Sequence, residues 1–487
     1  MANDATLVKN LTEPLDYTEA FSADYTVTVN GEPVPVRLCR VSSYPLNRVW
    51  PGQQRPVEQT HLASFTRFDL TAPAEIVVRA AHPFREAKLR PSGIVPITVD
   101  GDTVRFALTA PGQFSLELDG RRANLHIFAD APQAYDFDPV ACTYYFGPGV
   151  HEAGLIELHS GETLFIDADA IVYGTVRARN AEHIGIYGRG ILDYSRYERH
   201  DPLIWEEDGL LNFVACRDVT VEGITLRDSS WWNMTAFNCV GMEFRGVKVV
   251  GAWRYNTDGF DFVNSQQIHL DGCFLRAFDD VIVLKGLCVK PDRAYEKMDV
   301  ADVLVENCVV WCDWGGALEI GAETVADEYR NITYRNIHIL CNVHGAMRIH
   351  AGDRADIHNV SYENITVEYT PYDRAPIYQD TDETPYAPAD VPALPEALRA
   401  WMYCGVWSPD NIPGHVHDIR YKNIALLVDP GVADAEALCT NRWVQFLGAD
   451  AEHRVSGVTI ENLTVNGERL TAPAMQTNEF AENIAVK

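Results

Sequence analysis

A short unit recurs along the second half of the chain and limits what it can fold into. The unit is an apolar or aromatic residue, a polar residue, Gly or Asn, and another apolar residue. The units begin at Val221, Phe244, Leu270, Val305, Tyr334, Tyr362, Tyr421 and Ile460. From Val221 to Tyr362 successive starts lie between 23 (244 − 221) and 35 (305 − 270) residues apart. Recurrent units of this size predict a solenoid of stacked coils.

Two other repeat architectures fit the pattern less well. A leucine-rich repeat would show its leucine spacing, and a propeller would repeat every ~40 residues or more with paired hairpin turns. Neither pattern appears in the sequence, which favours the coils of a parallel β-helix. The Asn that recurs within the unit is expected to be structural, because stacked amide side chains hydrogen-bond along a solenoid and satisfy the turn backbone.

A different pattern precedes the repeat. Between about residues 22 and 130, short runs alternate apolar and polar positions, and turn dipeptides such as Asn30-Gly31 and Asp100-Gly101 separate them. The clearest runs are 25–29, 74–78, 97–99, 104–108 and 114–118. Two-residue alternation between such turns is typical of an antiparallel β-sandwich. We therefore expect an all-β chain with an N-terminal β-sandwich domain in residues 1–135 and a β-helix domain in residues 136–487.

Charge and composition restrict the partners. The formal net charge of −29 argues against nucleic acid or an anionic membrane surface, because both repel an acidic protein. No apolar run approaches the ~20 residues that span a bilayer, and residues 1–6 lack the features of a secretory signal, so we expect a cytoplasmic protein. The 11 cysteines form no CxxC pair and are expected to be buried free thiols. A homo-oligomer remains open.

Two acidic runs lie about one coil apart. The first is Asn256-Thr257-Asp258 and the second contains Asp279-Asp280, so Asp258 and Asp279 are separated by 21 residues (279 − 258). Neighbouring strands lie roughly 4.7 to 4.9 Å apart, which predicts that these carboxylates are near neighbours. Close, buried like charges raise one another's pKa, and such a set can divide into a proton donor and a base. Glycoside hydrolysis needs that division. The alternative is a set of solvated turn residues or a calcium site.

With these motifs the chain resembles glycoside hydrolase family 28, the polygalacturonase family, over roughly residues 140 to 470. The resemblance implies a right-handed parallel β-helix. Two family signatures, an Asn-Thr-Asp turn and an Asp-Asp pair, are present. In place of the family's Gly-His-Gly turn and Arg-Ile-Lys strand stand Gly315-Gly316-Ala317 and Arg348-Ile349-His350.

The resemblance also implies roles. Asp279 corresponds to the general acid, and Asp258 and Asp280 correspond to the carboxylates that activate water on the opposite face of the sugar. Such a reaction inverts the anomeric centre, and it requires no metal or organic cofactor. Without a secretion signal the enzyme would meet imported oligosaccharides, which favours exo action at a chain end.

The two departures bear on the substrate. In the family the arginine and lysine hold a uronic acid carboxylate, so Arg348 could still do so while His350 would be a weaker, pH-dependent cation. Glu319 could accept hydrogen bonds from neutral sugar hydroxyls or pair with Arg348. Lys285 could contact a carboxylate or the substrate. Galacturonides, rhamnose-containing pectin fragments and neutral glycans all stay open as substrates.

Two residues of the acidic runs are further candidates for substrate binding. They are Asn256, in the Asn-Thr-Asp turn, and Asp261, which could instead hydrogen-bond its own turn.

A long segment from Pro371 to Pro413, rich in aromatic residues and proline, is expected to form a loop that walls a sugar-binding cleft or packs against another subunit. Two other functions remain possible on this fold. One is a polysaccharide lyase, which needs a strong base and commonly calcium. The other is a carbohydrate-binding solenoid without catalytic activity.

Overall fold

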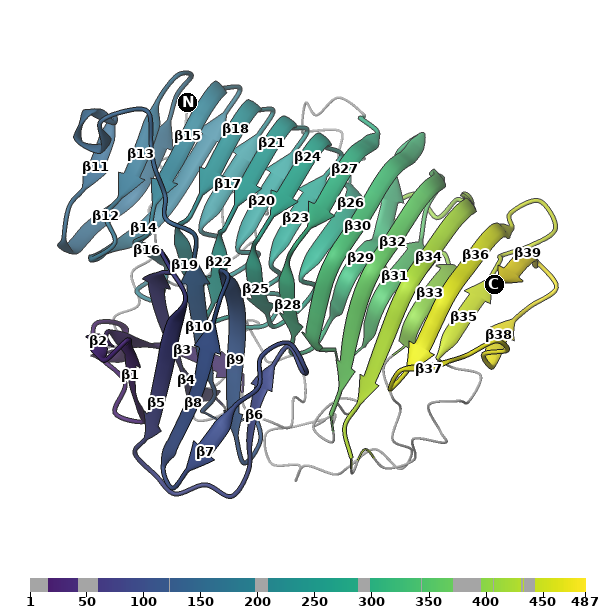
Figure 1. Cartoon of the computed structure of the whole chain (residues 1–487). Helices are drawn as coiled ribbons and strands as arrows, with labels where there is room; N and C mark the ends of the chain where they lie inside the picture. Colours follow the sequence, from purple (N-terminus) through teal and green to yellow (C-terminus); the bar gives the residue numbers. More distant parts are fainter. Residues whose placement is uncertain are drawn as a thin grey trace, which may run out of the picture.

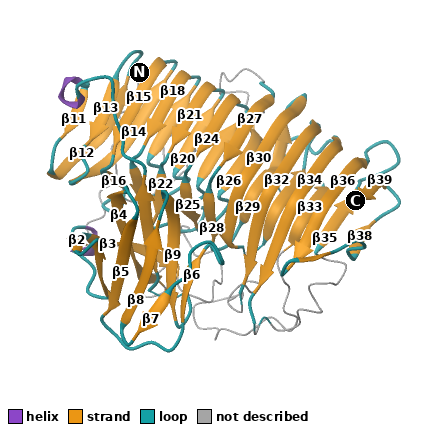
Figure 2. Cartoon of the chain, viewed as in Figure 1, coloured by secondary structure: helices purple, strands orange, loops and turns teal. Residues whose placement is uncertain are grey.

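The computed structural model describes residues 16–42, 60–121, 123–197, 209–287, 298–342, 344–370, 396–405, 407–430, 432 and 443–487. Its strands form two five-stranded sheets and one continuous set of 29 strands. Figure 2 shows that strands account for nearly all the regular structure. Two short 3₁₀ helices, η1 (Asp16–Thr18) and η4 (Pro139–Ala141), accompany them. The predicted fold, a right-handed parallel β-helix with an N-terminal β-sandwich, is confirmed.

The sandwich consists of two sheets that face each other across an apolar core. The first sheet has the order β2 (Glu32–Val34), β1 (Tyr25–Val29), β5 (Ala74–Ala80), β8 (Thr103–Leu108) and β7 (Thr98–Asp100). The second has the order β3 (Val36–Ser42), β4 (Thr60–Asp69), β10 (Leu125–Asp130), β9 (Gly112–Leu118) and β6 (Ala87–Arg90). All neighbours are antiparallel except β4 and β10. Alternate residues such as Ile76 and Val78 of β5 point into the core, as period-two alternation requires.

The predicted domain boundary after residue 135 falls between the last sandwich strand, β10, and the first strand of the solenoid, β11 (Tyr144–Phe146). The division into two independent domains remains a prediction.

The β-helix begins with coils that are built mostly from three short strands. These strands are β12 (Gly149–Leu158), β13 (Thr163–Ile166), β14 (Ala170–Arg179), β15 (Glu182–Gly188), β16 (Ile191–Asp193), β17 (Leu211–Val214), β18 (Arg217–Glu222), β19 (Thr225–Arg227), β20 (Met234–Phe237), β21 (Val240–Arg245), β22 (Lys248–Val250), β23 (Phe260–Val263), β24 (Gln266–Asp271), β25 (Phe274–Ala277), β26 (Ile282–Leu287), β27 (Val300–Glu306) and β28 (Val309–Cys312). From β17 to β27 each strand pairs in parallel with the third strand after it, so that three sheets run along the solenoid.

The later coils merge two of these strands into one. Both β27 and β28 pair with β30, which is 14 residues long. The strands of this part are β29 (Gly316–Val325), β30 (Glu328–Cys341), β31 (Gly345–Ala351), β32 (Asp356–Tyr369), β33 (Glu396–Met402), β34 (His415–Val428), β35 (Val444–Leu447), β36 (Val455–Val465), β37 (Glu468–Arg469), β38 (Met475–Thr477) and β39 (Ala481–Val486). Figure 1 shows the coils stacked side by side from β11 to β39.

The recurrent asparagines form the predicted ladder. Each Asn side chain donates from its amide nitrogen to the amide oxygen of the preceding coil, at 3.1 Å for Asn336 to Asn307 and 2.9 Å for Asn364 to Asn336. Asn423 and Asn462 continue the ladder at 2.9 and 3.0 Å. All these residues have φ between +55° and +56°, a conformation that Asn tolerates better than most residues. The repeat is therefore structural, as expected.

The sandwich packs along one side of the β-helix, beside the column of strands β19, β22, β25 and β28 (Figure 1). The rings of Phe128 and Phe274 lie 4.9 Å apart, and Arg276 donates to the side chain of Asn124 at 3.1 Å. Phe128 also belongs to the same buried cluster as the core of the β-helix. Buried Lys248 forms an ion pair with Asp130 at 3.0 Å. The two parts thus share a packed interface.

The nine described cysteines are all free, and seven of them are buried, including Cys216, Cys239, Cys273 and Cys308. This agrees with the expectation of buried thiols. None of the helices in the described ranges is long and apolar enough to cross a membrane.

Candidate active site

The acidic runs occupy equivalent turns of consecutive coils. Asp258 stands two residues before Phe260, and Asp280 two residues before Ile282, which is the partner of Phe260 in the parallel pair β23–β26. The next pair, β26–β29, aligns Ile282 with Leu318 and therefore places Gly316 at the same level. Backbone bonds from Gly259 N to Asp280 O (2.7 Å) and from Val281 N to Gly316 O (2.9 Å) fix this register. The predicted proximity of the carboxylates follows from it.

Asp279 is a carboxyl group without a described cationic partner. It is half-buried and accepts a hydrogen bond from Nδ2 of Asn256 at 3.3 Å. Burial raises its pKa well above the ordinary value, and the charges of Asp258 and Asp280 add to this rise. The Lys285 ammonium opposes the rise, but the surroundings of Asp279 favour its protonated form over the charged one.

Asp258 is in a different environment because it faces Lys285. Its Oδ2 lies 3.2 Å from Nζ of Lys285, which also lies 3.0 Å from Oδ1 of Asp261. Burial raises the pKa of Asp258 to about 7, with the Lys285 ammonium opposing the rise and Asp280 adding to it. Asp261 is fully buried, and burial raises its pKa well above the ordinary value. Lys285 therefore contacts carboxylates, one of the two roles expected for it.

Asp280 is held by the backbone. Its Oδ1 accepts the N–H of Gly316 at 2.7 Å. A Cβ on the neighbouring Gly315 would come within 2.6 Å of Oδ1 of both Asp279 and Asp280. Glycine is needed there because the two carboxyl groups approach the backbone so closely.

Glu319 and Arg348 form an ion pair on the adjacent strands β29 and β31. Oε2 of Glu319 lies 3.3 Å from Nη1 of Arg348. Burial raises the pKa of Glu319, and the Arg348 guanidinium opposes this rise. Burial also works against the charge of Arg348, but Glu319, Glu396 and Asp280 outweigh it and raise the Arg348 pKa. The structure thus contains the pairing alternative for Glu319.

His350 is not a cation at neutral pH. Burial, together with the neighbouring Arg348, lowers its pKa to about 4. Its Nε2 lies 3.1 Å from the carbonyl oxygen of Tyr403, and its ring stacks on Trp401 at a centroid distance of 4.6 Å. The side chain therefore contributes a neutral ring and a hydrogen-bonding nitrogen rather than a positive charge.

Sequence reasoning missed Glu323. Between the pairs Leu284–Ile320 and Gly286–Thr324, the residues 321–323 of β29 oppose the single residue Lys285. Glu323 therefore lies in a bulge, where it interacts electrostatically with Lys285, and burial raises its pKa. No periodicity in the sequence signals such a bulge.

The aromatic segment from Pro371 to Pro413 is only partly described. Residues 371–395 and 406 lie outside the described residues. The described part includes strand β33, which continues the sheet of β29 and β31. The expectation of one long loop is therefore wrong for Glu396–Met402, and Trp401 stands on a strand.

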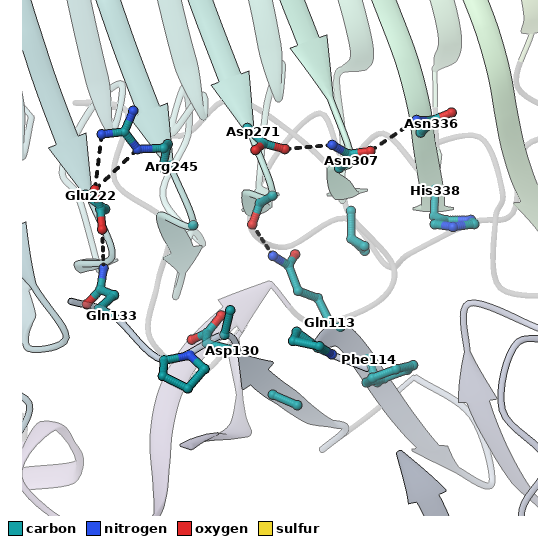
Figure 3. A pocket seen from close by; sticks show the side chains of 18 of the residues that line it. Gln113, Phe114, Asp130, Gln133, Glu222, Arg245, Asp271, Asn307, Asn336 and His338 are labelled. Carbon is teal, nitrogen blue, oxygen red and sulfur yellow. Dashed lines mark hydrogen bonds and ion pairs between the residues drawn. The ribbon is translucent and has the colours of Figure 1, made fainter. Parts of the chain in front are cut away.

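A separate cavity of about 820 Å³ lies between the sandwich and the β-helix, lined by Gln113, Gln133, Glu222, Arg245 and other residues (Figure 3). Its charged side chains pair with each other, as Arg245 does with Glu222 at 3.2 Å. None of the candidate catalytic residues lines it. In the described part of the chain, no group of three or more His, Cys, Asp or Glu side chains is arranged to hold a metal ion.

Comparison with known proteins supports the assignment that the motifs suggested. A model of the family described as Glycosyl hydrolases family 28 matches residues 182–393, a range that contains every candidate site residue. The resemblance to glycoside hydrolase family 28 is confirmed. The match to this family model thus covers the coils that carry the carboxylates, including those that contain Gly316 and His350.

Among curated proteins, the chain is similar to rhamnogalacturonase B of Aspergillus niger, with 23% identity over 217 residues. This covers 42% of the chain and 36% of that relative. A probable rhamnogalacturonase A of Aspergillus oryzae is 20% identical over 219 residues, which cover 43% of the chain and 44% of the relative. The match therefore spans less than half the length of these relatives.

Among solved structures, Dex49A from Penicillium minioluteum aligns with a TM-score of 0.64 and 15% identity, covering 100% of this chain and 97% of that one. At this identity the likeness shows the fold alone. It extends over the sandwich, which the family 28 match does not reach.

Proposed function

We propose that the protein is an inverting glycoside hydrolase that cleaves O-glycosyl bonds in oligosaccharides of the pectin type, working from a chain end. The observation that carries the proposal is the division among three neighbouring carboxyl groups. Asp279 forms no described ion pair, Asp258 faces Lys285, and Asp280 accepts a backbone N–H. One acid and two potential bases on adjacent turns are the groups that this reaction uses.

Asp279 is the general acid. Burial and the neighbouring carboxylates raise its pKa, which favours the protonated form that a general acid needs. That proton passes to the glycosidic oxygen as the bond between this oxygen and the anomeric carbon breaks. Asn256, which donates to Oδ2 of Asp279 at 3.3 Å, orients the carboxyl group so that the other oxygen faces the substrate.

Asp258 and Asp280 activate the water. The water oxygen attacks the anomeric carbon from the face opposite the leaving group, and its proton passes to one of these carboxylates. The hydroxyl group that forms on the sugar has the inverted configuration. The Lys285 ammonium lowers the pKa of Asp258 against the effect of burial, and so maintains an ionised fraction of this base.

Two observations support the substrate and the mode of action. The relatives named above are rhamnogalacturonases, which supports a pectin-type chain. The N-terminal residues reach the turn before Asp258, because Tyr17 and Trp253 both donate to the buried carboxylate of Asp228. Extra protein on this side of the site supports attack at a chain end rather than in the middle of a polymer. The cytoplasmic location stays a prediction.

The test is hydrolysis of a panel of pectin-derived oligosaccharides by the protein and by Asp279→Asn, followed by proton NMR of the first product. We expect a product of inverted anomeric configuration, released from one end of the chain. Loss of the general acid should reduce the rate about 10²- to 10⁴-fold. Asp169→Asn is the matched control because Asp169 is exposed in a distant turn, and it should leave the rate unchanged.

Other outcomes discriminate between the alternatives. A product with an unsaturated ring that absorbs in the ultraviolet would identify a lyase. Equal binding of an oligosaccharide by both proteins without any product would identify a binding protein. A product of retained configuration would contradict the inverting mechanism while leaving hydrolysis in place.

A further inference from the structure

The arginines beside the candidate site are already paired with carboxyl groups. Nη1 of Arg348 lies 3.3 Å from Oε2 of Glu319. On the next strand, Nη1 of Arg399 lies 2.9 Å from Oε1 of Glu396, and its guanidinium lies 4.0 Å from the ring centroid of Trp401. Burial raises the pKa of Glu319 to about 8, and once this carboxyl group is ionised it compensates the Arg348 charge before any substrate arrives.

The remaining basic side chains at the site are also either paired with carboxyl groups or uncharged. Lys285 lies between Asp258 and Asp261 at 3.2 and 3.0 Å. Burial lowers the pKa of both His344 and His350 to about 4, with Arg348 contributing in each case, so neither ring is charged at neutral pH. Among the described residues at the site, we find no cation that is left without an acidic partner.

The strand register places Glu319 and Arg348 in one column with Asp261, and of this ion pair the Arg348 side chain is the more accessible, at 15% exposure. Asp261 aligns with Val283, Val283 with Glu319, Glu319 with Arg348, and Arg348 with Arg399. Neighbours in such a column are about 4.8 Å apart. A sugar chain that extends from the catalytic turns along the strands therefore passes over the Glu319–Arg348 pair.

The glycine at position 316 and the glutamate at position 319 belong together. A Cβ on Gly316 would lie 2.4 Å from Oε2 of Glu319 and 3.4 Å from Nη1 of Arg348. The Glu319 carboxyl group therefore fills the space beside position 316, where the family 28 signature has a histidine. Any larger residue at 316 would displace Glu319 from Arg348.

These contacts restrict the charge of the sugar. A uronic acid carboxylate beside Arg348 would compete with Glu319 and would lie near Asp280 and Glu396, and like charges in a buried site repel. A neutral sugar hydroxyl can instead donate to Glu319 and accept from Arg348 without changing the charge of the site. We propose that the sugar ring bound beside Arg348 is neutral and that Glu319 determines this specificity. This proposal depends on the proposed function only for the position of the bound sugar chain. It is compatible with a pectin-type substrate, because such a chain contains neutral as well as uronic sugars.

The test compares two probes that differ only in charge, trigalacturonate and its carboxyl-reduced form. A rhamnogalacturonan tetrasaccharide and its carboxyl-reduced form provide a second matched pair. Binding is measured by calorimetry at pH 9, where Glu319 with its pKa of about 8 is ionised. The Asp279→Asn background is used so that hydrolysis does not interfere. We expect the reduced forms to bind at least tenfold more tightly than the acidic forms. Adding Glu319→Gln should shift this ratio at least tenfold towards the acidic forms, because it releases the Arg348 charge.

Two further variants show whether the released charge is responsible. Adding Arg348→Gln to Glu319→Gln should abolish the gain in binding of the acidic probes. Glu222→Gln is the matched control, since Glu222 forms an ion pair with Arg245 in the distant cavity of Figure 3, and it should leave the ratio unchanged. The proposal is overturned if the acidic forms bind more tightly in the background protein. It is also overturned if Glu319→Gln leaves the ratio unchanged, or if neither member of either pair binds.

This experiment and the hydrolysis assay can fail separately. A tenfold preference for the reduced forms with no turnover by the unmodified protein would support the specificity and contradict the hydrolase. Hydrolysis of uronides with no effect of Glu319→Gln on binding would support the hydrolase and contradict the specificity.

Discussion

The two sides of the β-helix use stacked positions in opposite ways. On the turn side, one residue type repeats from coil to coil, and Asn336, Asn364, Asn423 and Asn462 bond to each other in sequence. An amide side chain carries both a donor and an acceptor, so identical neighbours satisfy one another. The turn side is therefore ordered by repetition of one residue type from coil to coil.

On the strand side that faces the candidate site, no single residue type runs through the column. The column along β29, β31, β33 and β35 begins with an acidic residue, continues with two arginines and ends with a neutral amide: Glu319, Arg348, Arg399 and Gln445. Stacked carboxylates would repel each other, and the acidic turns are compatible with folding because Lys285 lies among them. Repeated neutral side chains therefore stabilise the solenoid. Side chains of different charge form its candidate active site.

Among substitutions that test this difference between the two sides, Lys285→Met is expected to have the largest effect on stability and turnover. The substitution keeps most of the volume but leaves Asp258 and Asp261 buried without their cation. Breaking a buried ion pair in this way costs about 3–5 kcal/mol, which urea unfolding at pH 7 will measure, and turnover should be lost with it. Lys422→Met, a change on the half-buried Lys422 of β34, should cost less than about 1 kcal/mol. Equal costs for the two variants would contradict the role of Lys285.

The pH dependence of the reaction provides the next test. The pKa of Asp258 is raised to about 7, and as a base it must be deprotonated. The rate should therefore fall as pH drops through about 7, approximately tenfold per unit and about a hundredfold by pH 5. A rate that stays constant from pH 7 to pH 5 would assign the base role to Asp280 alone.

Stability should change in the opposite direction. The folded protein holds the Asp258 proton more tightly than the unfolded chain, whose carboxyl pKa is about 4. The contribution of this group to stability is present below that value and is lost as pH rises towards about 7. Other carboxyl groups of the site have raised pKa values as well, so urea unfolding at pH 5 and pH 7 should show a smaller loss in Asp258→Asn than in the protein.

A smaller effect is expected on the turn side from Asn364→Ala. The change removes two ladder bonds of 2.9 Å, to Asn336 and from Asn423, and places Ala at a φ of +56°. Unfolding should become easier by about 1–3 kcal/mol, with turnover unchanged within about twofold. Asn364→Gly keeps the backbone conformation and isolates the cost of the bonds. A loss of turnover would show that the two sides are coupled.

The smallest effect is expected from Tyr362→Phe. The Tyr334, Tyr362 and Tyr421 rings stack at 5.0 Å, and no described residue hydrogen-bonds to the buried Tyr362 hydroxyl. Removing that hydroxyl should be neutral or should stabilise by up to about 1 kcal/mol, measured as a change in Tm. A marked destabilisation would reveal a partner for the hydroxyl.

The sequence predicted those features of the structure that follow from the repeated unit and from the spacing of charged residues. The recurrent unit indicated the solenoid, the asparagine at its third position indicated the ladder, and the spacing of Asp258 from Asp279 and Asp280 brought the carboxylates together. These inferences succeed because strand stacking converts sequence spacing into distance.

Other features depend on local irregularities that spacing does not reveal. The pair β23–β26 is offset by 22 residues (282 − 260), so Asp280 rather than Asp279 aligns with Asp258. The bulge in β29 brings Glu323 towards Lys285. The contact of Tyr17 with Asp228 joins residues 211 positions apart, which no local pattern predicts.

The regular coils have one more consequence. Strands β30 and β32 have the same length of 14 residues and the same order of buried and exposed positions, 28 residues apart (356 − 328). Because the coils are structurally equivalent, each one adds one strand spacing, about 4.8 Å, to the length of the solenoid. Adding or deleting a coil would lengthen or shorten the surface available to a long ligand while leaving the chemistry of the other coils in place.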